Sequence, residues 1–264
     1  MIELYLPREL KSLIAGKRYV VDDVGMSSSK VLIFDDMVLK IQPDTQETRT
    51  EQTMLAWLDG KLPVPKCLFH TVEDGINYLL MSRVSGKMAC DAQLLEDPKL
   101  LVSILAESLK KLWQVDITGC PVKWNLQHKL VAAREAVDAG AVNVEDAEPE
   151  TFGTNGFESP SALLAWLSAN QPPEDLVLSH GDFCLPNVFV EAQQLSGLID
   201  LGRTGVADRW QDIALCWRSL KHNYGAKYGG KVYENFDPDC LFDALDIVPD
   251  REKLNYYILL DELF

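Results

Sequence analysis

Three polar side chains between residues 180 and 203 have the types and spacing that phosphoryl transfer requires. Asp182 and Asn187 lie five residues apart in a loop that contains a glycine and a proline, and Asp200 follows after two short apolar runs. Phosphoryl transfer needs a carboxylate that orients the acceptor hydroxyl and hard oxygen ligands that hold Mg²⁺ on the nucleotide phosphates. Asp and Asn are also common in turns, but the ordered set favours Asp182 as the catalytic carboxylate and Asn187 and Asp200 as metal ligands.

A lysine and a glutamate nearer the start of the chain could hold the nucleotide phosphates. Lys40 follows apolar residues at the end of a predicted strand, and a helix is predicted over 45–58, where an Asp-Gly pair stops it. Glu51 shares the apolar face of that helix, where a carboxylate needs a partner. Lys40 is the candidate partner, and such a pair grips the α- and β-phosphates in kinases. Glu47, one turn earlier, is the competing candidate.

The net charge of −15 is spread unevenly along the chain. Up to residue 85 there are 10 basic and 12 acidic side chains, whereas from residue 86 onward there are 15 and 28. No Lys or Arg lies between Arg134 and Arg203, an interval that holds 12 Asp or Glu. Acidic surfaces often serve only solubility, but these acids flank the candidate catalytic loop. The pattern argues against nucleic acid as a partner and favours a polycationic small-molecule substrate.

Composition indicates a globular protein outside the membrane. The chain has 264 residues and 47% hydrophobic content, enough for one large domain or two lobes. No run approaches the roughly 18 apolar residues of a membrane span, and the start lacks the basic and apolar regions of a secretory signal, so we expect a cytoplasmic protein. The six cysteines form no C-x-x-C pair, which predicts free thiols, several of them buried. His180 is expected to be a structural hydrogen-bonding residue rather than a base.

The periodicity of the chain predicts a sheet followed by helices. Strands are expected at 19–24, 30–34, 37–41, 67–70 and 78–81, which would make an N-terminal antiparallel sheet. Asp97 and the proline after it predict the start of a helix that runs through 113. Further helices are expected over 125–139, 159–168, 212–221 and 256–264, with an acidic irregular segment at 142–156.

One stretch imitates a nucleotide-binding motif. Gly225-Ala-Lys-Tyr-Gly-Gly-Lys231 fits the start of a P-loop, but Val232 replaces the Ser or Thr that would hold Mg²⁺. The preceding residues are predicted to be a helix rather than a strand. We therefore expect a turn that ends a helix.

The motif His180-Gly-Asp182 with Asn187, followed by Asp200-Leu-Gly202, resembles the eukaryotic-like kinase superfamily. Glycine replaces the Arg of the protein-kinase catalytic loop and leucine replaces the Phe of the metal-binding motif, departures that indicate the small-molecule branch. Longer strings are similar to aminoglycoside 3'-phosphotransferases over essentially the whole chain: Ile199-Asp-Leu-Gly-Arg203, Asp208-Arg-Trp-Gln-Asp212 and Leu260-Asp-Glu-Leu-Phe264.

This resemblance implies roles for further residues. Ser27, in the loop 25–29, would contact the ATP phosphates, Glu51 rather than Glu47 would hold Lys40, and backbone groups of Ser82 and Val84 would bond the adenine. The substrate-binding residues implied by the resemblance are Asp146, Glu148, Glu150, Arg203, Arg218, Asp261, Glu262 and Phe264. His222 stands where the best-known members place an acid, which puts one substrate contact in doubt.

The expected fold is α+β and protein-kinase-like. An N-terminal antiparallel sheet lobe with one helix, residues 1–85, would join a larger, mostly helical C-terminal lobe, residues 86–264. The resemblance implies Mg²⁺-dependent phosphorylation, by ATP or GTP, of the 3' hydroxyl of aminoglycosides such as kanamycin, which would give antibiotic resistance. A kinase for a macrolide, choline or a metabolite is the alternative, and a nucleotide-binding module without catalysis is disfavoured by the complete residue set.

Overall fold

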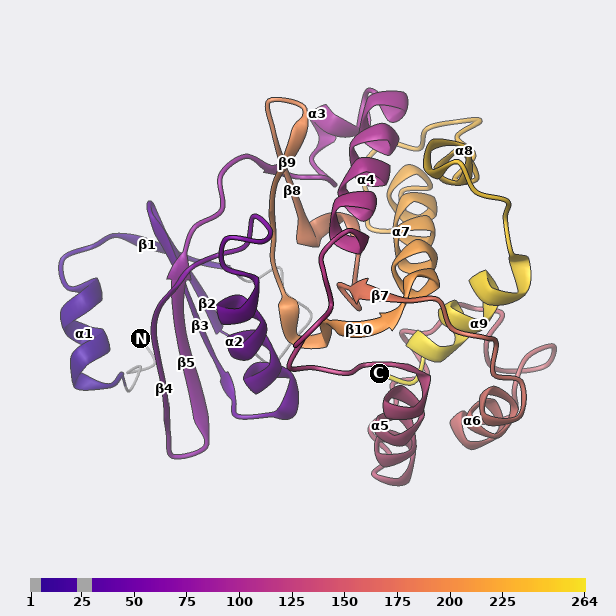
Figure 1. Ribbon diagram of the computed structural model, residues 1–264, viewed down its shortest axis with the longest axis horizontal. Coiled ribbons are helices and arrows are strands. Elements are labelled where there is room, and N and C mark those ends of the chain that lie inside the picture. Colours follow the sequence, from indigo (N-terminus) through magenta and orange to yellow (C-terminus); the bar gives the residue numbers. More distant parts are fainter. Residues whose placement is uncertain (1–5, 23–29) are drawn as a thin grey trace.

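The computed structural model describes residues 6–22 and 30–264. The described chain has a sheet-rich part and a larger helical part side by side (Figure 1). The sheet is antiparallel, in the order β1-β2-β3-β5-β4. Its strands are β1 (Tyr19–Asp22), β2 (Lys30–Phe34), β3 (Met37–Pro43), β4 (Cys67–Glu73) and β5 (Ile76–Ser82). The predicted strands are confirmed over their described residues, with the hairpin of β4 and β5 longer than expected. Residues 23 and 24, the end of the first predicted strand, lie outside the described residues.

The two faces of this sheet pack in different directions because side chains alternate along a strand. Tyr78 and Leu80 of β5 join Leu10 of helix α1 (Arg8–Ile14) in a small separate core. Leu79 and Met81 face the other way, toward helix α2 (Gln46–Leu58), and belong to the large core of the molecule. The prediction of one helix here missed α1, and α2 is confirmed.

The larger part is mainly helical, with three short strand pairings. Its helices are α3 (Ala92–Leu95), α4 (Pro98–Trp113), α5 (Leu126–Asp138), α6 (Pro160–Ala169), α7 (Arg209–Tyr224), α8 (Cys240–Leu245) and α9 (Arg251–Asp261). Its strands are β6 (Lys87–Met88), β7 (Leu176–Ser179), β8 (Val188–Glu191), β9 (Gln194–Leu198) and β10 (Gly205–Asp208). They pair as β6-β8-β9 and β7-β10. The 3-10 turns η1 (Leu185–Asn187) and η2 (Leu201–Arg203) stand beside them.

The helical predictions are confirmed with two shifts of boundary. Helix α7 is longer than the predicted 212–221, and the C-terminal helix begins at Arg251 and ends at Asp261 rather than spanning 256–264. The false P-loop is a turn that follows α7, with Gly229 and Gly230 at positive φ. The chain passes from β5 to β6 through residues 83–86, and the boundary at 85/86 stays a prediction.

The state of the cysteines agrees only in part with the prediction from the sequence. All six cysteines are free, but Cys216 alone among them is fully buried, so the expectation of several buried thiols was too strong.

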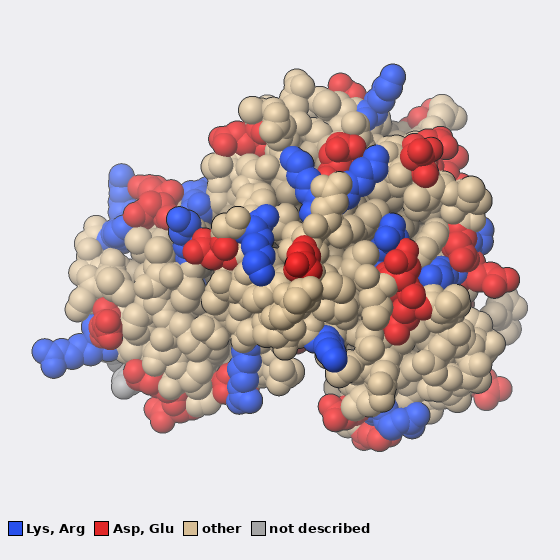
Figure 2. All heavy atoms as spheres, viewed as in Figure 1, with Lys and Arg blue, Asp and Glu red and all other residues tan. Residues whose placement is uncertain are grey.

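Within residues 6–22 and 30–264, no helix is long and apolar enough to cross a membrane. Figure 2 shows acidic and basic side chains interspersed on the displayed face rather than gathered in one basic patch.

A buried charged cluster joins α7 to α9. Asp208 caps α7 by accepting a hydrogen bond from the Trp210 N–H at 3.2 Å. Its Oδ2 also accepts from Lys253 Nζ at 3.0 Å and from the Tyr257 hydroxyl at 2.9 Å, and all three side chains are buried. A buried charge depends on its partner, so this cluster fixes the C-terminal helix on the helix that follows the catalytic region.

We expect Asp208→Ala to lower the free energy of unfolding by about 3 to 5 kcal/mol, because it leaves the Lys253 ammonium buried without its partner. Asp175→Ala is the matched control, since it breaks an exposed pair with Arg209 at 2.8 Å that contributes about 1 kcal/mol or less. Urea unfolding of both variants gives the comparison. Equal losses in the two variants would contradict this assignment.

Candidate active site

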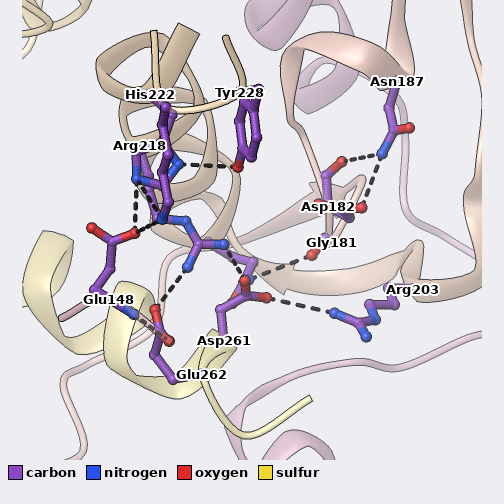
Figure 3. Close-up of polar contacts among 12 residues, drawn as sticks. Glu148, Gly181, Asp182, Asn187, Arg203, Arg218, His222, Tyr228, Asp261 and Glu262 are labelled. Atoms are coloured by element: carbon purple, nitrogen blue, oxygen red, sulfur yellow. Dashed lines mark hydrogen bonds and ion pairs between the residues drawn. The ribbon is translucent and has the colours of Figure 1, made fainter. Parts of the chain in front are cut away.

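The loop that carries Asp182 is held in one conformation by its own polar groups (Figure 3). The Asn187 amide nitrogen donates to Asp182 Oδ2 at 2.9 Å and to the Asp182 carbonyl at 3.0 Å. These bonds orient the Asp182 carboxylate. They use only the nitrogen of the Asn187 amide, so its oxygen is the atom that can accept a hydrogen bond or hold a metal ion. Burial raises the pKa of Asp182, with Asp261 acting in the same direction and Arg203 opposing it.

Asp212, on α7, anchors the backbone of the same loop. Its buried carboxylate accepts from Ser179 Oγ at 2.9 Å, from the His180 N–H at 3.2 Å and from the Gly181 N–H at 3.0 Å. Burial raises the pKa of Asp212, and these donors oppose the rise. No role was predicted for Asp212. The sequence did contain a signal for such a role. Asp212 stands just before the apolar run that starts at Ile213, where a buried carboxylate needs hydrogen-bond partners.

His180 and Gly181 complete this anchoring. His180 is fully buried and its Nε2 lies 2.9 Å from the Ile199 carbonyl, which confirms the predicted structural role. Thr204 Oγ1 donates to the His180 carbonyl at 2.9 Å. Gly181 has φ 82°, and a Cβ there would lie 2.0 Å from the Arg203 carbonyl oxygen. The backbone before Asp182 therefore has no room for a side chain.

Lys40 connects the sheet to the catalytic region. Its Nζ lies 2.6 Å from Glu51 Oε1 and 3.3 Å from Asp200 Oδ1. Burial opposes the charge of Lys40, but Glu51 and Asp200 outweigh it and raise its pKa. Lys40 in turn lowers the pKa of Asp200. The structure brings the predicted pair together, while Glu47 faces Arg203 instead, at 2.9 Å from its Nε.

Asp200 and Asn187 form a donor set that suits Mg²⁺. Asp200 has φ 61° and ψ 62°, at the start of η2, and its carboxylate keeps one oxygen that does not face Lys40. Among the residues described, no three His, Cys, Asp or Glu side chains gather closely enough to hold a metal. Mg²⁺ commonly uses one or two protein oxygens together with substrate phosphates, so a carboxylate and an amide oxygen fit this ion.

Residues 82–84, the candidate adenine-binding segment, contact Lys66 through Ser82 and Gly197 of β9 through Val84. The Ser82 N–H donates to the Lys66 carbonyl at 2.9 Å, so this N–H does not serve a ligand. Within the described part of the chain, the Val84 N–H and carbonyl make no backbone hydrogen bond, and the Val84 side chain packs against Gly197 of β9. Ser27 lies outside the described residues.

A second group of predicted residues lines a pocket of about 170 Å³ beside the catalytic loop. Six of the eight predicted substrate-binding residues line it: Asp146, Glu148, Arg218, Asp261, Glu262 and Phe264. They come from the acidic segment, from α7 and from the end of the chain, as Figure 3 shows for Glu148, Arg218, Asp261 and Glu262. Glu150 is exposed and faces a different hollow, which Trp217 and Asn255 also line.

Two arginines hold the C-terminal carboxylates. Arg218 pairs with Asp261 and, at 3.1 Å, with Glu262. Arg203 lies 3.6 Å from Asp261 and its guanidinium carbon lies 5.3 Å from the Phe264 ring centroid. Asp261 therefore bridges both arginines, and the end of the chain is fixed against the catalytic region as expected.

Glu148 is also paired within the protein. Its Oε1 lies 2.6 Å from Lys227 Nζ and 2.7 Å from His222 Nε2, and its Oε2 lies 3.8 Å from Lys221 Nζ. The Glu148 N–H donates to Glu262 Oε2 at 3.0 Å. Sequence reasoning missed Lys227, because it lies 79 residues from Glu148 in the segment set aside as a false P-loop.

The comparisons with known proteins agree with this geometry. A model of the phosphotransferase enzyme family matches residues 19–239. The chain belongs to this family. It is 39% identical over 267 aligned positions to an aminoglycoside 3'-phosphotransferase of Niallia circulans, covering 98% of this chain and 97% of the relative. An aminoglycoside 3'-phosphotransferase of Enterococcus faecalis is 37% identical, with 100% of both chains covered.

Solved structures confirm the predicted kinase-like α+β fold of this phosphotransferase. A type VIII aminoglycoside 3'-phosphotransferase matches with a TM-score of 0.80 at 29% identity, covering 97% of both chains. An aminoglycoside phosphotransferase of Streptomyces rimosus, solved with ADP and streptomycin, matches with a TM-score of 0.78 at 25% identity, covering 96% of this chain and 95% of that chain.

The pocket of this phosphotransferase contains a histidine that resists protonation. Burial lowers the pKa of His222 from 6.5 to about 4, with Lys227, Arg218 and Lys221 acting in the same direction and Glu148 opposing. Between pH 6.5 and about pH 4, His222 is therefore protonated in the unfolded chain but not in the folded protein. The free energy of unfolding decreases as the pH falls through this window.

We expect the free energy of unfolding to decrease between pH 7 and pH 5 by on the order of 1 kcal/mol more in the parent than in His222→Gln, after allowance for solvent screening. Urea unfolding at the two pH values measures the difference. Parallel losses in both proteins would show that His222 does not titrate in this way.

Proposed function

We propose that this phosphotransferase transfers the γ-phosphoryl group of ATP to the 3' hydroxyl of an aminoglycoside such as kanamycin. The observation that carries the proposal is that charged groups of two kinds surround the loop of Asp182. Lys40, Glu51 and Asp200 form one connected group, and Arg203 and Asp261, which pair with each other, both act on the Asp182 pKa. The names of the relatives supply the substrate class and the 3' position.

The proposed nucleotide site uses groups from both parts of the chain. The Ser82 carbonyl and the Val84 N–H bond the adenine, Lys40 holds the α- and β-phosphates, and Glu51 keeps Lys40 in place. Ser27 is proposed as a further phosphate contact from the sequence resemblance. Asn187 and Asp200 would hold Mg²⁺, which would neutralise negative charge on the nucleotide phosphates. GTP is proposed as a second donor.

Asp182 orients the acceptor hydroxyl for in-line attack and takes its proton. Because the transition state is loose, correct placement matters more than the strength of the base. The hydrogen bonds from Asn187 hold the carboxylate at the required angle. The backbone contacts of Asp212 prevent the loop from relaxing away from the nucleotide.

The proposed acceptor site recognises protonated amines by carboxylates. Asp146, Glu148, Asp261 and Glu262 line one small pocket, and Phe264 closes it. Each charge-assisted hydrogen bond to an ammonium group is worth about 1.5 to 3 kcal/mol. Arg203 and Arg218 position Asp261 and Glu262, and Glu150 is proposed as an outer contact.

We expect Asp182→Ala and Asp182→Asn to reduce kcat with ATP, Mg²⁺ and kanamycin by about a thousandfold, since neither side chain can accept the proton. Nucleotide affinity should remain near that of the parent, because Asp182 does not contact the bases or phosphates in this arrangement. Coupled ADP-release kinetics and calorimetry measure the two quantities, and phosphorus NMR of the product locates the phosphate.

The parent protein supplies the decisive result for the proposal. Drug-dependent turnover with phosphate on the 3' hydroxyl supports it. Nucleotide binding without turnover of any aminoglycoside would contradict the substrate assignment and direct attention to macrolides, choline and small metabolic alcohols as acceptors.

We expect Lys40→Met to raise the KM for ATP by about 10- to 100-fold, because a charge-assisted contact with the phosphates is lost. The KM for kanamycin should change little. Lys17→Met is the control, as it removes a lysine of the same part that pairs with Asp36 on the surface. Initial rates at varied ATP distinguish the variants. An unchanged KM for ATP would remove Lys40 from the nucleotide site.

A further inference from the structure

Glu148 is predicted to bind a substrate amine, yet a lysine of the protein already occupies its carboxylate. Lys227 Nζ lies 2.6 Å from Glu148 Oε1, inside the pocket that Asp146, Asp261 and Glu262 also line. A lysine ammonium has the same charge and the same donors as a protonated amine of an aminoglycoside. The two groups are therefore chemically equivalent at this carboxylate.

The carboxylate side of this pair is fixed. The Glu148 N–H is bonded to Glu262 Oε2, and Glu262 is held by Arg218. His222 Nε2 lies 2.7 Å from Glu148 Oε1. Because an ionised carboxylate only accepts, Nε2 carries the proton, and Nδ1 accepts from the Tyr228 hydroxyl at 3.2 Å. Removing Lys227 therefore leaves Glu148 in place, with His222 still bonded to it.

The lysine side of the pair can move. Lys227 lies in the turn after α7, and 41% of its side chain is exposed. Arg218, by contrast, is 20% exposed and bonds two carboxylates. A long exposed side chain with a single carboxylate partner among the described residues can leave that partner and enter water at little cost. Arg218 is a fixed part of the pocket, whereas Lys227 can be displaced.

We propose that Lys227 is an intramolecular competitor for Glu148, which a substrate ammonium must displace, and that it thereby sets the affinity and selectivity of the pocket for polycationic acceptors. This inference rests on the proposed function of the same site. A tethered ammonium acts at a high local concentration. It therefore weakens binding at Glu148 most for acceptors that present an amine there.

The local sequence supports this specialisation. His222, whose Nε2 lies 2.7 Å from Glu148, lines this side of the pocket and adds no negative charge to it. With Lys227 paired to Glu148, and with Asp261 and Glu262 paired to arginines, Asp146 is the pocket carboxylate without an ion pair among the described residues. The pocket should therefore favour acceptors whose amines reach Asp146 without requiring Glu148.

The test is the kinetics and binding of kanamycin with Lys227→Ala and Lys227→Gln. We expect the KM and the calorimetric Kd for kanamycin to fall by about two- to fivefold, the range that an exposed ion pair allows, with kcat unchanged. Lys231→Ala is the matched control. It removes a lysine of the same turn whose partner is Glu96, at 3.1 Å and outside the pocket, so its KM should equal that of the parent.

The same substitution in a Glu148→Gln background separates competition from a general charge effect. Lys227→Ala should then have no effect on KM, because the carboxylate for which it competes is gone. A lower KM in both backgrounds, or an unchanged or higher KM and Kd in Lys227→Ala alone, would overturn the inference. If the parent protein phosphorylates kanamycin but the Lys227 variants give one of these contrary results, the inference about Lys227 fails and the proposed function stands. If the parent protein neither binds nor phosphorylates kanamycin, the inference and the proposed function both fail.

Discussion

The buried carboxylate of Asp212 is the constraint on which the catalytic arrangement depends. It accepts three hydrogen bonds from the end of β7 and the loop that follows it. A carboxylate without solvent contact is tolerated only when donors surround it, so the loop and α7 require each other. The position of Asp182 therefore depends on the hydrogen bonds of Asp212 in the core rather than on contacts of Asp182 at the surface.

The two parts of the chain meet through charges on either side of this loop. Lys40, from the sheet, reaches both Glu51 of α2 and Asp200. Arg203, just after Asp200, reaches Glu47 of the same helix. Helix α2 therefore offers two carboxylates to different partners, and its apolar side joins the large core. A shift of α2 would disturb Lys40 and the candidate metal-binding carboxylate of Asp200 together.

The acidic pocket is a balanced ion-pair network rather than an open negative field. Arg218 and Arg203 neutralise the C-terminal carboxylates, and Lys227 and Lys221 approach Glu148. Such pairing reduces the cost of placing several carboxylates in a cavity of about 170 Å³. Under the proposed function, a polycation would bind by exchanging partners with these groups, and the displaceable ones would tune its affinity.

The sequence by itself determined the elements and the chemistry of the catalytic loop, because strand alternation, helix caps and motif spacing are local. It therefore predicted α2, α4 and α5 and the set of Asp182, Asn187 and Asp200, whereas for Lys40 it left Glu47 and Glu51 as alternative partners until the family resemblance favoured Glu51. The tertiary structure alone decided which charges pair. Asp212 meets a loop about thirty residues away and Lys227 meets Glu148 across 79 residues. An interval without a single Lys or Arg looked like a free acidic surface, yet ion pairs depend on distance in space, which composition and spacing along the chain do not contain.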